Sequence, residues 1–455
     1  METNTSYPNL LQSLSFKIEA KTAVLAVIGL GYVGLPVASM FASKGFRVFG
    51  IDLKTDRINL INEGENPIEG DEPGLAELLN RVVKSGNLIA TTEYSILSQA
   101  DVILVDVETP TDDQHIPRYN ALRGACSSLG EHAKPGALVI IESTIAPGTI
   151  SGTVKPILLE AAIKRKITPF HIGACPERVM PGKLLANLRS MSRVCGGETP
   201  KIAEVMVQLY RQIVEAELDT AAIITAELTK TAENAYRDVN IAFANELAMI
   251  CEVAGGDFLE VRRLVNKSPG RNVLLAGAGV GGHCIPKDPW LLAYGAKGKF
   301  DPVLIPAARA VNDGMPKRIA EKAFSLLNDQ GVPSEDAVVT ILGFAYLEDS
   351  DDTRNSPTEM LVNTLSPLIG ELRIHDPYVK PYQTDVYETL KGSDIVIVMV
   401  AHAIYKTLDL VRVTGLLQHP IMLDGRRVIN ASKANQFGLQ YYAIGLGKSL
   451  TSRTD

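Results

Sequence analysis

One cysteine lies in a stretch of chain with little side-chain bulk around it. Cys284 belongs to residues 279–290, GVGGHCIPKDPW, between a glycine cluster and a Pro-Lys-Asp turn. A packing cysteine normally sits in an apolar helix or strand, and this segment resembles neither. A free thiol has a pKa of about 8.5, so a nucleophilic cysteine needs help to ionise. Lys287 could favour the thiolate, and Asp288 could orient a water or a proton carrier. The residues alone leave a nucleophile and a packing role equally open.

A second pair with possible chemistry lies in ELTKTAEN. Lys230 and Asn234 are four residues apart, so they share one face of a helix. An ammonium group beside a carboxamide can stabilise an alkoxide or an oxyanion. Solvated helix faces carry such pairs often, and without further support the spacing favours that plainer interpretation.

A glycine-rich turn near the N-terminus predicts a dinucleotide site. The segment GLGYVG places Gly29, Gly31 and Gly34, with Tyr32 and Val33 between them, after an apolar run and at the opening of a helix. The first glycine permits the tight turn, the second lets the backbone approach a pyrophosphate, and the third allows close packing of helix on strand. The amides of the helix N-terminus then face the phosphates.

An acidic residue strengthens this prediction. Asp52 ends the next apolar run, at about the distance expected for the carboxylate that binds the ribose hydroxyls. A carboxylate there would repel a 2′-phosphate, so NAD is favoured over NADP. Arg57 is close enough in sequence to reach the adenosine end, and a solvated surface arginine is the equal alternative.

The elements that must position these residues follow an α/β pattern. From Lys21 onward, short apolar runs predict strands in TAVLAVIG, RVFGIDL, ADVILVDVETP and ALVIIESTIAPG, and after Pro316 in AVVTILGFA, LRIHDPYV, GSDIVIVMVAH and HPIMLDGRRVI. Between the two sets, residues 225–254 contain no Gly or Pro and predict one helix about 45 Å long. A helix of that length favours a link between domains or a subunit interface over burial in one domain.

The sequence therefore predicts two doubly wound Rossmann-type domains joined by a central long-helix domain. The expected boundaries are an N-terminal extension at 1–20, an NAD-binding domain at 21–210, a central helical domain for dimerisation and catalysis at 211–315, and a Rossmann-like domain for the nucleotide-sugar at 316–455. The long helix favours a homo-oligomer, a dimer or a larger assembly.

The composition narrows the function classes. The chain has 455 residues, 46% of them hydrophobic and 21% charged, which suits a globular protein of two or three domains. A net charge of −7 without a Lys/Arg-rich block argues against nucleic acid as a partner. No apolar run is long enough to span a bilayer, and residues 1–20 do not read as a secretory signal. Five widely spaced cysteines argue against a disulfide framework and against paired-cysteine metal sites, so we expect a reduced, cytoplasmic protein without a metal.

Six motifs occur in the order found in nucleotide-sugar 6-dehydrogenases. They are VIGLGYVGLP, ESTIAPGT, CPERVMPGK, ELTKTAENAYRDVN, GAGVGGHCIPKDPW and DDTRNSP, and together they extend from Lys21 into the C-terminal domain. The chain thus resembles the UDP-glucose/GDP-mannose dehydrogenase family. The resemblance implies that the C6 hydroxyl of a UDP-sugar is oxidised twice, with NAD accepting a hydride each time and without release of the aldehyde.

The same resemblance implies roles for the reactive residues. Cys284 matches the residue that traps the aldehyde as a thiohemiacetal, whose oxidation gives a thioester. Lys230 and Asn234 match residues that stabilise charge on oxygen, and Asp288 matches an acid that works with a water. Glu177 matches a glutamate linked to thioester hydrolysis and proton transfer.

The resemblance also implies contacts to the cofactor and the substrate. Thr144 matches a threonine near the nicotinamide and water, and Thr109 matches a position that contacts NAD. Expected substrate contacts are Glu177, Arg178, Lys230, Asn234, Arg271, Val273, Gly277, Gly281, His283 and Arg354. Arg271, which would act across a subunit boundary, is slightly displaced from the arginine of UDP-glucose enzymes.

Three departures from UDP-glucose enzymes resemble the branch that acts on N-acetylhexosamines. Pro181 replaces a glutamate, His283 replaces a serine or tyrosine, and Leu347 replaces a lysine. Arg178 and His283 could donate to an acetamido carbonyl, although a loop histidine satisfied by backbone is as plausible. The expected substrate is UDP-N-acetyl-D-mannosamine, with UDP-N-acetylglucosamine or UDP-glucose as alternatives. A two-electron β-hydroxyacid-type dehydrogenase, or a nucleotide-sugar sensor without turnover, is the rival from another class.

Overall fold

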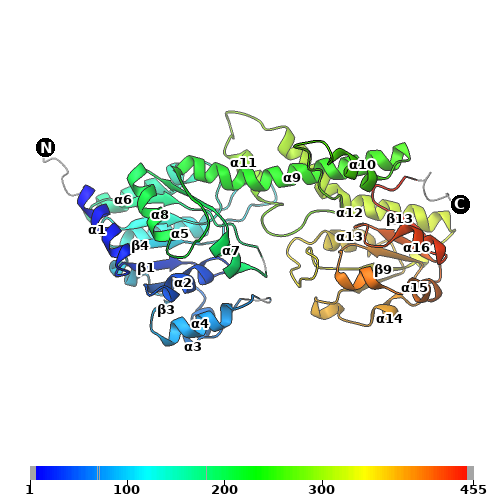
Figure 1. Cartoon of the computed structure of the whole chain (residues 1–455), viewed down its shortest axis with the longest axis horizontal. Coiled ribbons are helices and arrows are strands. Elements are labelled where there is room, and N and C mark those ends of the chain that lie inside the picture. The colour runs from blue at the N-terminus through cyan, green and yellow to red at the C-terminus, as the bar shows by residue number, and fades with distance from the viewer. Residues whose placement is uncertain (1–6, 69, 71, 181, 448–455) are drawn as a thin grey trace. The chain divides into compact units, whose positions relative to one another are not determined.

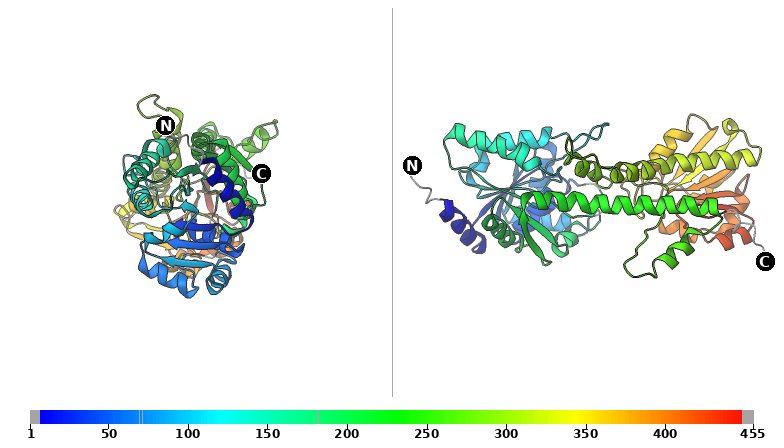
Figure 2. Two further views of the ribbon diagram at one scale, coloured as in Figure 1. Left: turned by 90° about the vertical axis from the view of Figure 1, so that its left-hand side faces the viewer. Right: turned by 90° about the horizontal axis from the view of Figure 1, so that it is seen from above.

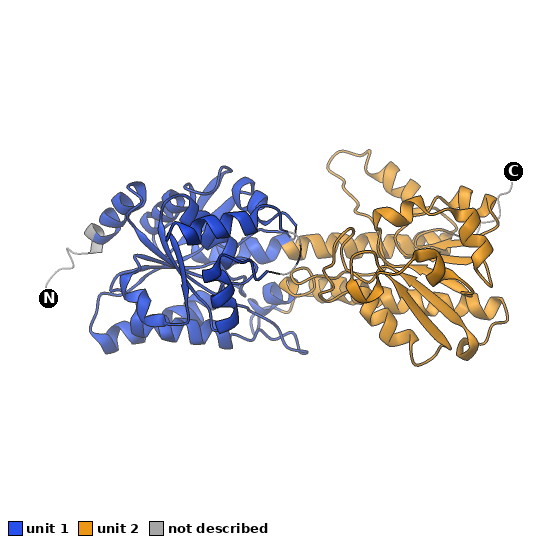
Figure 3. Cartoon of the chain, turned by 90° about the horizontal axis from the view of Figure 1, so that it is seen from below, with its two compact units in different colours: residues 1–233, 290–300 blue, residues 234–289, 301–455 orange. Residues whose placement is uncertain are grey.

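The structure is a computed structural model that describes residues 7–68, 70, 72–180 and 182–447. Pro181, one of the three departures noted above, lies outside the described residues. The chain forms two compact units (Figure 3): unit 1 comprises residues 1–233 and 290–300, and unit 2 comprises residues 234–289 and 301–455. Within the described part of the chain, no helix is both long and apolar enough to cross a membrane.

Unit 1 is built on an eight-stranded sheet in the order β3-β2-β1-β4-β5-β6-β7-β8 (Figure 1). Its strands are β1 (Val24–Ile28), β2 (Arg47–Ile51), β3 (Leu88–Thr91), β4 (Val102–Val105), β5 (Leu138–Ile141), β6 (His171–Ala174), β7 (Arg193–Gly197) and β8 (Leu218–Ala222). All neighbouring strands pair in parallel except β6 and β7, which are antiparallel. The order from β3 to β6 is that of a dinucleotide-binding fold, whose ligands bind at the carboxyl ends of the strands.

Successive residues of β1 enter opposite cores, as a parallel strand covered on both faces requires. Leu25 and Val27 pack with the helices α1 (Tyr7–Glu19), α2 (Gly34–Ser43), α3 (Thr55–Glu63), α4 (Leu75–Lys84), α7 (Leu184–Ser190) and α8 (Pro200–Tyr210). Ala26 and Ile28 pack with α5 (Asn120–His132) and α6 (Lys155–Arg165) on the other face. Short helical turns η1 (Tyr94–Gln99) and η2 (Ile150–Val154) complete the unit, together with α11 (Asp288–Tyr294), most of which belongs to it.

Unit 2 has a five-stranded, all-parallel sheet in the order β10-β9-β11-β12-β13. Its strands are β9 (Val338–Leu342), β10 (Glu371–His375), β11 (Ile395–Val398), β12 (Ile421–Asp424) and β13 (Gln440–Ala443). One face is covered by α9 (Ile223–Ala254), α10 (Phe258–Val265), α12 (Leu304–Asp329) and α13 (Pro357–Leu365). The other face is covered by α14 (Val386–Leu390), α15 (Leu410–Leu416) and α16 (Ala431–Gln436), and the turns η3 (Ser334–Asp336), η4 (Lys380–Tyr382) and η5 (Ala403–Thr407) connect the elements. This is the second common doubly wound order.

The long helix predicted over residues 225–254 is confirmed as α9, which is unbroken in Figures 1 and 2. The boundary between the units falls within it, at Glu233 and Asn234. In unit 2, α12 packs along α9 through buried polar contacts: Arg309 Nη1 donates to Asp238 Oδ1, and Asn312 Oδ1 accepts from Asn245 Nδ2.

The predicted fold class and all eight quoted strands are confirmed. The sequence did not predict the helix α1, the continuation of α12 through Pro316, or the remaining strands β3, β6, β7, β8 and β13, of which β7 is antiparallel to β6. Leu11, Leu14 and Ile18 of α1 are buried in the core of unit 1, so this part of the expected N-terminal extension packs onto the sheet layer. The domain boundaries drawn from the sequence stay a prediction.

Candidate active site

The dinucleotide loop of unit 1 has the geometry that its glycines predict. Gly29 has a φ of +94°, and a Cβ atom on Gly34 would lie 1.9 Å from the Gly29 carbonyl oxygen. A Cβ on Gly31 would meet no protein atom within 4 Å. Backbone conformation and close packing therefore require the first and third glycines. The space beside Gly31 is open to a ligand, as the binding of a pyrophosphate requires. Val33 precedes α2 without a side-chain cap.

Asp52 lies at the end of β2, beside this loop. Its Oδ2 accepts from Leu30 N at 2.9 Å and from Arg57 Nη1 at 2.9 Å, and its Oδ1 accepts from Lys54 N at 3.0 Å. Burial alone would raise the pKa of Asp52, but the hydrogen bonds from Lys54, Arg57 and Leu30 outweigh it and hold the pKa below its usual value. Asp52 is thus a fixed carboxylate, and Arg57 is its ion-pair partner in this structure.

Two threonines expected near the cofactor meet in unit 1. Thr109 is buried, and its Oγ1 donates to the carbonyl oxygen of Thr144 at 2.6 Å. Thr109 follows β4 and Thr144 follows β5, so both lie at the carboxyl edge of the sheet. Tyr32 of the glycine loop donates to Glu72, which also accepts from Gly182 N at 2.7 Å. Glu72 therefore ties the cofactor loop to the loop that follows Glu177.

Glu177 is nearly buried at the same edge of unit 1. Its Oε1 lies 2.7 Å from Arg193 Nη2, and its Oε2 accepts from Arg178 N at 2.6 Å. The Arg178 guanidinium donates to both carboxylate oxygens of Glu233 on α9 and to the carbonyl oxygen of Ser192 at 2.6 Å. Arg178 therefore fixes α9 against the loop after β6, and its expected contact with substrate stays a prediction.

The start of α9 is anchored in unit 1 by a buried acid. Glu227 accepts from Gly148 N at 2.7 Å and from Ile150 N at 2.9 Å. Burial raises the pKa of Glu227 above its usual value. Lys230 is half-buried one helical turn before Asn234, on the same face of α9.

In unit 2 the structure brings Asn234 to the cysteine turn. Asn234 Nδ2 donates to Asp288 Oδ2 at 2.6 Å, and Lys287 Nζ lies 3.3 Å from Asp288 Oδ1. Asp288 and Lys287 are both buried, whereas Cys284 is exposed. The other four cysteines, Cys126, Cys175, Cys195 and Cys251, are buried and free, and they pack in the hydrophobic cores. The turn thus carries an exposed thiol together with an ammonium group and a carboxylate that accepts from an amide, and these are group types used in covalent catalysis.

The glycines before Cys284 have a packing role. A Cβ on Gly281 would lie 2.5 Å from Tyr346 Cβ, and one on Gly282 would lie 2.8 Å from the Tyr346 ring. Gly279 has a φ of +128° and faces Pro357 at 2.8 Å. At these three positions the close neighbours of the backbone are therefore protein atoms.

Unit 2 also places His283 and Arg354 next to the cysteine turn. Arg354 O accepts from Gly282 N at 2.9 Å, and the Arg354 guanidinium donates to Asp352 at 2.5 to 3.1 Å. His283 is exposed, yet partial desolvation of its ring and the positive charges of Lys287 and Arg354 lower its pKa below 6.5. The imidazole is therefore neutral at pH 7.

The remaining predicted substrate residues lie on the segment between α10 and α11. Arg271 is exposed and donates to its neighbour Pro269 O at 2.9 Å. Val273 N donates to Asn266 Oδ1 at 2.7 Å, and Gly277 N donates to Asn245 Oδ1 of α9 at 2.9 Å. This backbone is thus fixed to α9 inside unit 2.

Several polar residues of the site were missed in the sequence. Asp106, Glu142 and Arg193 gather beside Glu177, and Arg426 donates to the carbonyl oxygens of Met399 and Gly279. Glu142 opens the quoted motif ESTIAPGT and Asp106 follows an apolar run, so both had a local signal. Nothing beside Arg193 in the sequence marks it, because its partners are distant along the chain.

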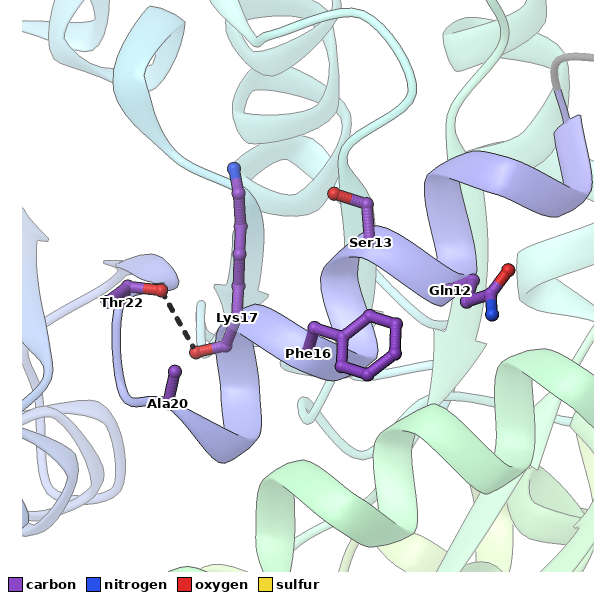
Figure 4. A pocket seen from close by; sticks show the side chains of 6 residues that line it. All are labelled: Gln12, Ser13, Phe16, Lys17, Ala20 and Thr22. Carbon is purple, nitrogen blue, oxygen red and sulfur yellow. Dashed lines mark hydrogen bonds between the residues drawn. The ribbon is translucent and has the colours of Figure 1, made fainter.

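A hollow on α1 has a different lining from the residues named above. It encloses about 550 Å³ and is lined by Gln12, Ser13, Phe16, Lys17, Ala20 and Thr22 (Figure 4). None of these is a predicted site residue, and the Thr22 hydroxyl bonds only the carbonyl oxygen of Lys17 in that view.

The chain is similar to several known nucleotide-sugar dehydrogenases. Relatives include the UDP-N-acetyl-D-mannosamine dehydrogenases of Pyrococcus horikoshii, 36% identical over 93% of this chain and 99% of the relative, and of Campylobacter jejuni, 34% identical over 83% and 95%. The solved structure of the Pyrococcus horikoshii enzyme superimposes with a TM-score of 0.86 over 93% of this chain and 99% of that chain. The NDP-N-acetyl-D-galactosaminuronic acid dehydrogenase of Methanosarcina mazei Go1 does so with a TM-score of 0.84 at 33% identity over 96% and 97%.

Three consecutive domain descriptions also match the chain. The NAD-binding domain of the UDP-glucose/GDP-mannose dehydrogenase family matches residues 23–214, its central domain residues 224–314, and its UDP-binding domain residues 340–431. NAD is therefore the cofactor, and a UDP-sugar is the class of substrate. The chain belongs to the UDP-glucose/GDP-mannose dehydrogenase family.

Proposed function

We propose that this protein oxidises C6 of UDP-N-acetyl-D-mannosamine to the carboxylate, with two NAD reduced per sugar. One observation carries the proposal: the 2.6 Å hydrogen bond from Asn234 to Asp288 joins the ELTKTAEN helix to the turn of Cys284. These two motifs are 54 residues apart, and a shared chemical task explains why they meet. The names of the relatives support the choice of sugar.

The residues divide the work as follows. When bound, NAD accepts a hydride from C6 in each oxidation. Lys230 and Asn234, on one face of α9, stabilise negative charge on the C6 oxygen. The Cys284 thiolate adds to the aldehyde carbon and gives a thiohemiacetal, whose oxidation gives a thioester. The covalent bond retains the sugar while the first reduced cofactor is exchanged.

Hydrolysis then restores the thiol. Water adds to the thioester carbon and loses a proton to Glu177, the carbon–sulfur bond breaks, and the Cys284 sulfur takes up a proton. Asp288 holds the Asn234 amide throughout, through the bond described above. In sum, one alcohol, two NAD⁺ and one water give one carboxylate, two NADH and three protons.

The substrate contacts are proposed from the same turn. Arg354 is more than one-third exposed and can pair with a diphosphate oxygen. His283, neutral at pH 7, keeps one N–H that can donate to an acetamido carbonyl. The backbone of Val273, Gly277 and Gly281 lines the sugar-nucleotide, and Arg271 reaches it from a neighbouring subunit.

A second substrate has a specific observation in its favour. A solved relative of nearly the same similarity is named for NDP-N-acetyl-D-galactosaminuronic acid. UDP-N-acetylglucosamine and UDP-glucose are further alternatives, although a solved UDP-glucose dehydrogenase from Pyrobaculum islandicum is only 26% identical.

The test is a panel of these UDP-sugars with NADH counted per sugar consumed. We expect the highest kcat/KM with UDP-N-acetyl-D-mannosamine and a ratio of two NADH per sugar. A ratio of one would exclude the four-electron scheme, and a preference for another hexose would move the assignment to that sugar. Absence of NADH with every sugar would leave a binding protein.

We also propose that the chain forms a dimer through α9. Tyr236, Phe243 and Ile250 are each more than half exposed and recur every seven residues, so they share one side of the helix. A second copy of the same helix would cover this stripe in a twofold contact.

We further propose that the protein is cytoplasmic. The free state of all five thiols supports this location.

A further inference from the structure

Three acidic side chains meet at the carboxyl edge of the unit 1 sheet. Asp106 follows β4 directly, Glu142 follows β5 directly, and Glu177 comes three residues after β6. Because these strands are neighbours and run parallel, their carboxyl ends lie side by side. The fold therefore concentrates negative charge where it binds its ligands.

Arg193 reaches this edge because β7 runs the other way. It is the first residue of β7, and the antiparallel pairing of β6 and β7 puts this end of β7 next to the carboxyl end of β6. Arg193 is only 1% exposed, with Nη1 3.2 Å from Glu142 Oε1 and Nη2 2.7 Å from Glu177 Oε1. Its guanidinium carbon lies 4.9 Å from the centre of the Tyr210 ring, and Tyr210 Oη donates to Glu142 Oε1 at 2.7 Å. The guanidinium is thus held on two carboxylates and one ring.

Three carboxylates and one guanidinium carry a net charge of −2, which one shared proton would reduce to −1. Glu142 Oε2 and Asp106 Oδ2 are buried and face no donor group among the described residues, yet the two side chains are within hydrogen-bonding reach of each other. Burial and the charge of Glu142 raise the pKa of Asp106 well above its usual value, and burial raises that of Glu142. A proton between them leaves the positive charge of Arg193 for Glu142 and Glu177.

Both oxygens of Glu177 are consequently fixed. Oε1 is held by Arg193, and Oε2 is held by the amide of Arg178. Without Arg193, the local backbone bond would be the only restraint that the described residues place on this carboxylate, and a nearly buried carboxylate would lose its cation. The arrangement fixes the Glu177 carboxylate in one orientation.

We propose that Arg193 is a positioning residue that holds the Glu177 carboxylate in place for the hydrolytic step. The hydrolytic role of Glu177 rests on the proposed function, whereas the contact between Arg193 and Glu177 does not. Arg193 itself acts through Glu177, with Glu142 and Tyr210 fixing its guanidinium.

A double-mutant cycle tests the proposal in turnover. Arg193→Lys keeps the charge, but one ammonium group cannot replace two guanidinium nitrogens, so we expect kcat to fall about 10- to 100-fold with little change in the KM for NAD. In a Glu177→Gln background, Arg193→Lys should change kcat less than about twofold. Equal losses in both backgrounds would show that Arg193 does not act through Glu177.

Arg309→Lys is the matched control. Arg309 is equally buried and pairs with Asp238 in unit 2, so its effect on kcat should combine with Glu177→Gln multiplicatively. Non-multiplicative behaviour of the control would mean that the cycle reports general loss of structure, which overturns the assignment to Arg193.

A thermal-unfolding cycle on the same variants needs no substrate. If Arg193 holds Glu177, the losses of Tm in Arg193→Lys and in Glu177→Gln should add up to more than the loss in the double variant. A loss in the double variant equal to that sum would show that the two residues do not interact. A wild-type protein that oxidises no UDP-sugar would refute the proposed function, while this cycle would still decide whether Arg193 holds Glu177.

Discussion

The turn of Cys284 is closed by its own backbone. The Cys284 carbonyl oxygen accepts from Lys287 N at 3.1 Å and from Asp288 N at 2.8 Å, which fixes the thiol relative to both charged residues. Asp288 in turn is held by Asn234. The proposed nucleophile thus lies in a turn held by groups to which the proposed mechanism also gives roles, and the proposed chemistry depends on sulfur at this position.

Replacement of Cys284 by serine should abolish uronate formation. A hydroxyl group has a much higher pKa than a thiol and is a poorer leaving group, so we expect a loss of about 1,000-fold or more. The rate of uronate production, measured with unchanged Tm, checks this. Cys251→Ser, at a buried thiol of unit 2, is the control and should retain turnover. Normal turnover by Cys284→Ser would refute the covalent scheme.

His283 should make the protein less stable in mild acid. Its pKa is lowered in the folded state, so below about pH 6.5 the unfolded chain binds more protons and the free energy of unfolding falls as the pH falls. This contribution is constant above pH 7. The Tm of His283→Gln should therefore fall less than the Tm of the wild type when the pH is lowered from 7 to 5. An identical pH dependence of the two proteins would contradict the assignment, and other histidines with lowered pKa, such as His171 and His375, are common to both.

At the scale of elements, the glycines in the loop between β1 and α2 have two different roles, one in packing and one in ligand binding. Gly34 packs against the Gly29 carbonyl oxygen, whereas Gly31 borders open space. The same residue type thus has a packing role at one position and leaves room for the cofactor at the other.

Two alanine substitutions in this loop should have different effects. Gly34→Ala forces a Cβ to within 1.9 Å of a backbone atom and should lower stability by about 1–3 kcal/mol. Gly31→Ala should leave Tm unchanged but weaken NAD binding about tenfold or more, because the methyl group takes the space of the pyrophosphate. Denaturant unfolding and NAD titration measure the two effects. Unchanged NAD affinity in Gly31→Ala would place the cofactor elsewhere.

At the scale of the whole molecule, the long helix α9 carries apolar side chains on two of its sides. α9 buries one side in the unit 2 core through Ala244, Ala248 and Cys251, and exposes Tyr236, Phe243 and Ile250 on another. A helix that is apolar on two sides is expected to have a partner on each.

Phe243→Glu should convert the proposed dimer into a monomer. A carboxylate on each copy of a twofold contact would face apolar surface and a like charge, which destabilises association. Light scattering coupled to size-exclusion chromatography measures the mass. Phe16→Glu, at a similarly exposed phenylalanine of α1, is the control and should not change it. A monomeric wild-type protein, or a dimeric Phe243→Glu variant, would exclude α9 as the interface.

Eight of the thirteen strands in the described part of the chain, the long helix and the glycine loop could be predicted from the sequence, and Cys284 could be singled out as a candidate nucleophile. Each of these has a local signal: alternation of apolar runs with helices, a helix without Gly or Pro, and glycines where backbone or ligand comes close. Asp52 and the pair Lys230 and Asn234 could be proposed for the same reason, because the spacing of residues along one strand or helix is fixed by its geometry.

Only the tertiary structure decided which of these residues touch. Asn234 meets Asp288 across 54 residues, Arg193 reaches Glu177 because β7 is antiparallel, and Gly281 and Gly282 pack on Tyr346 rather than opening a path to the thiol. Such contacts join residues far apart in the chain, and the composition around each residue does not specify its distant partner. The direction of one strand was enough to place a buried arginine on a candidate catalytic acid.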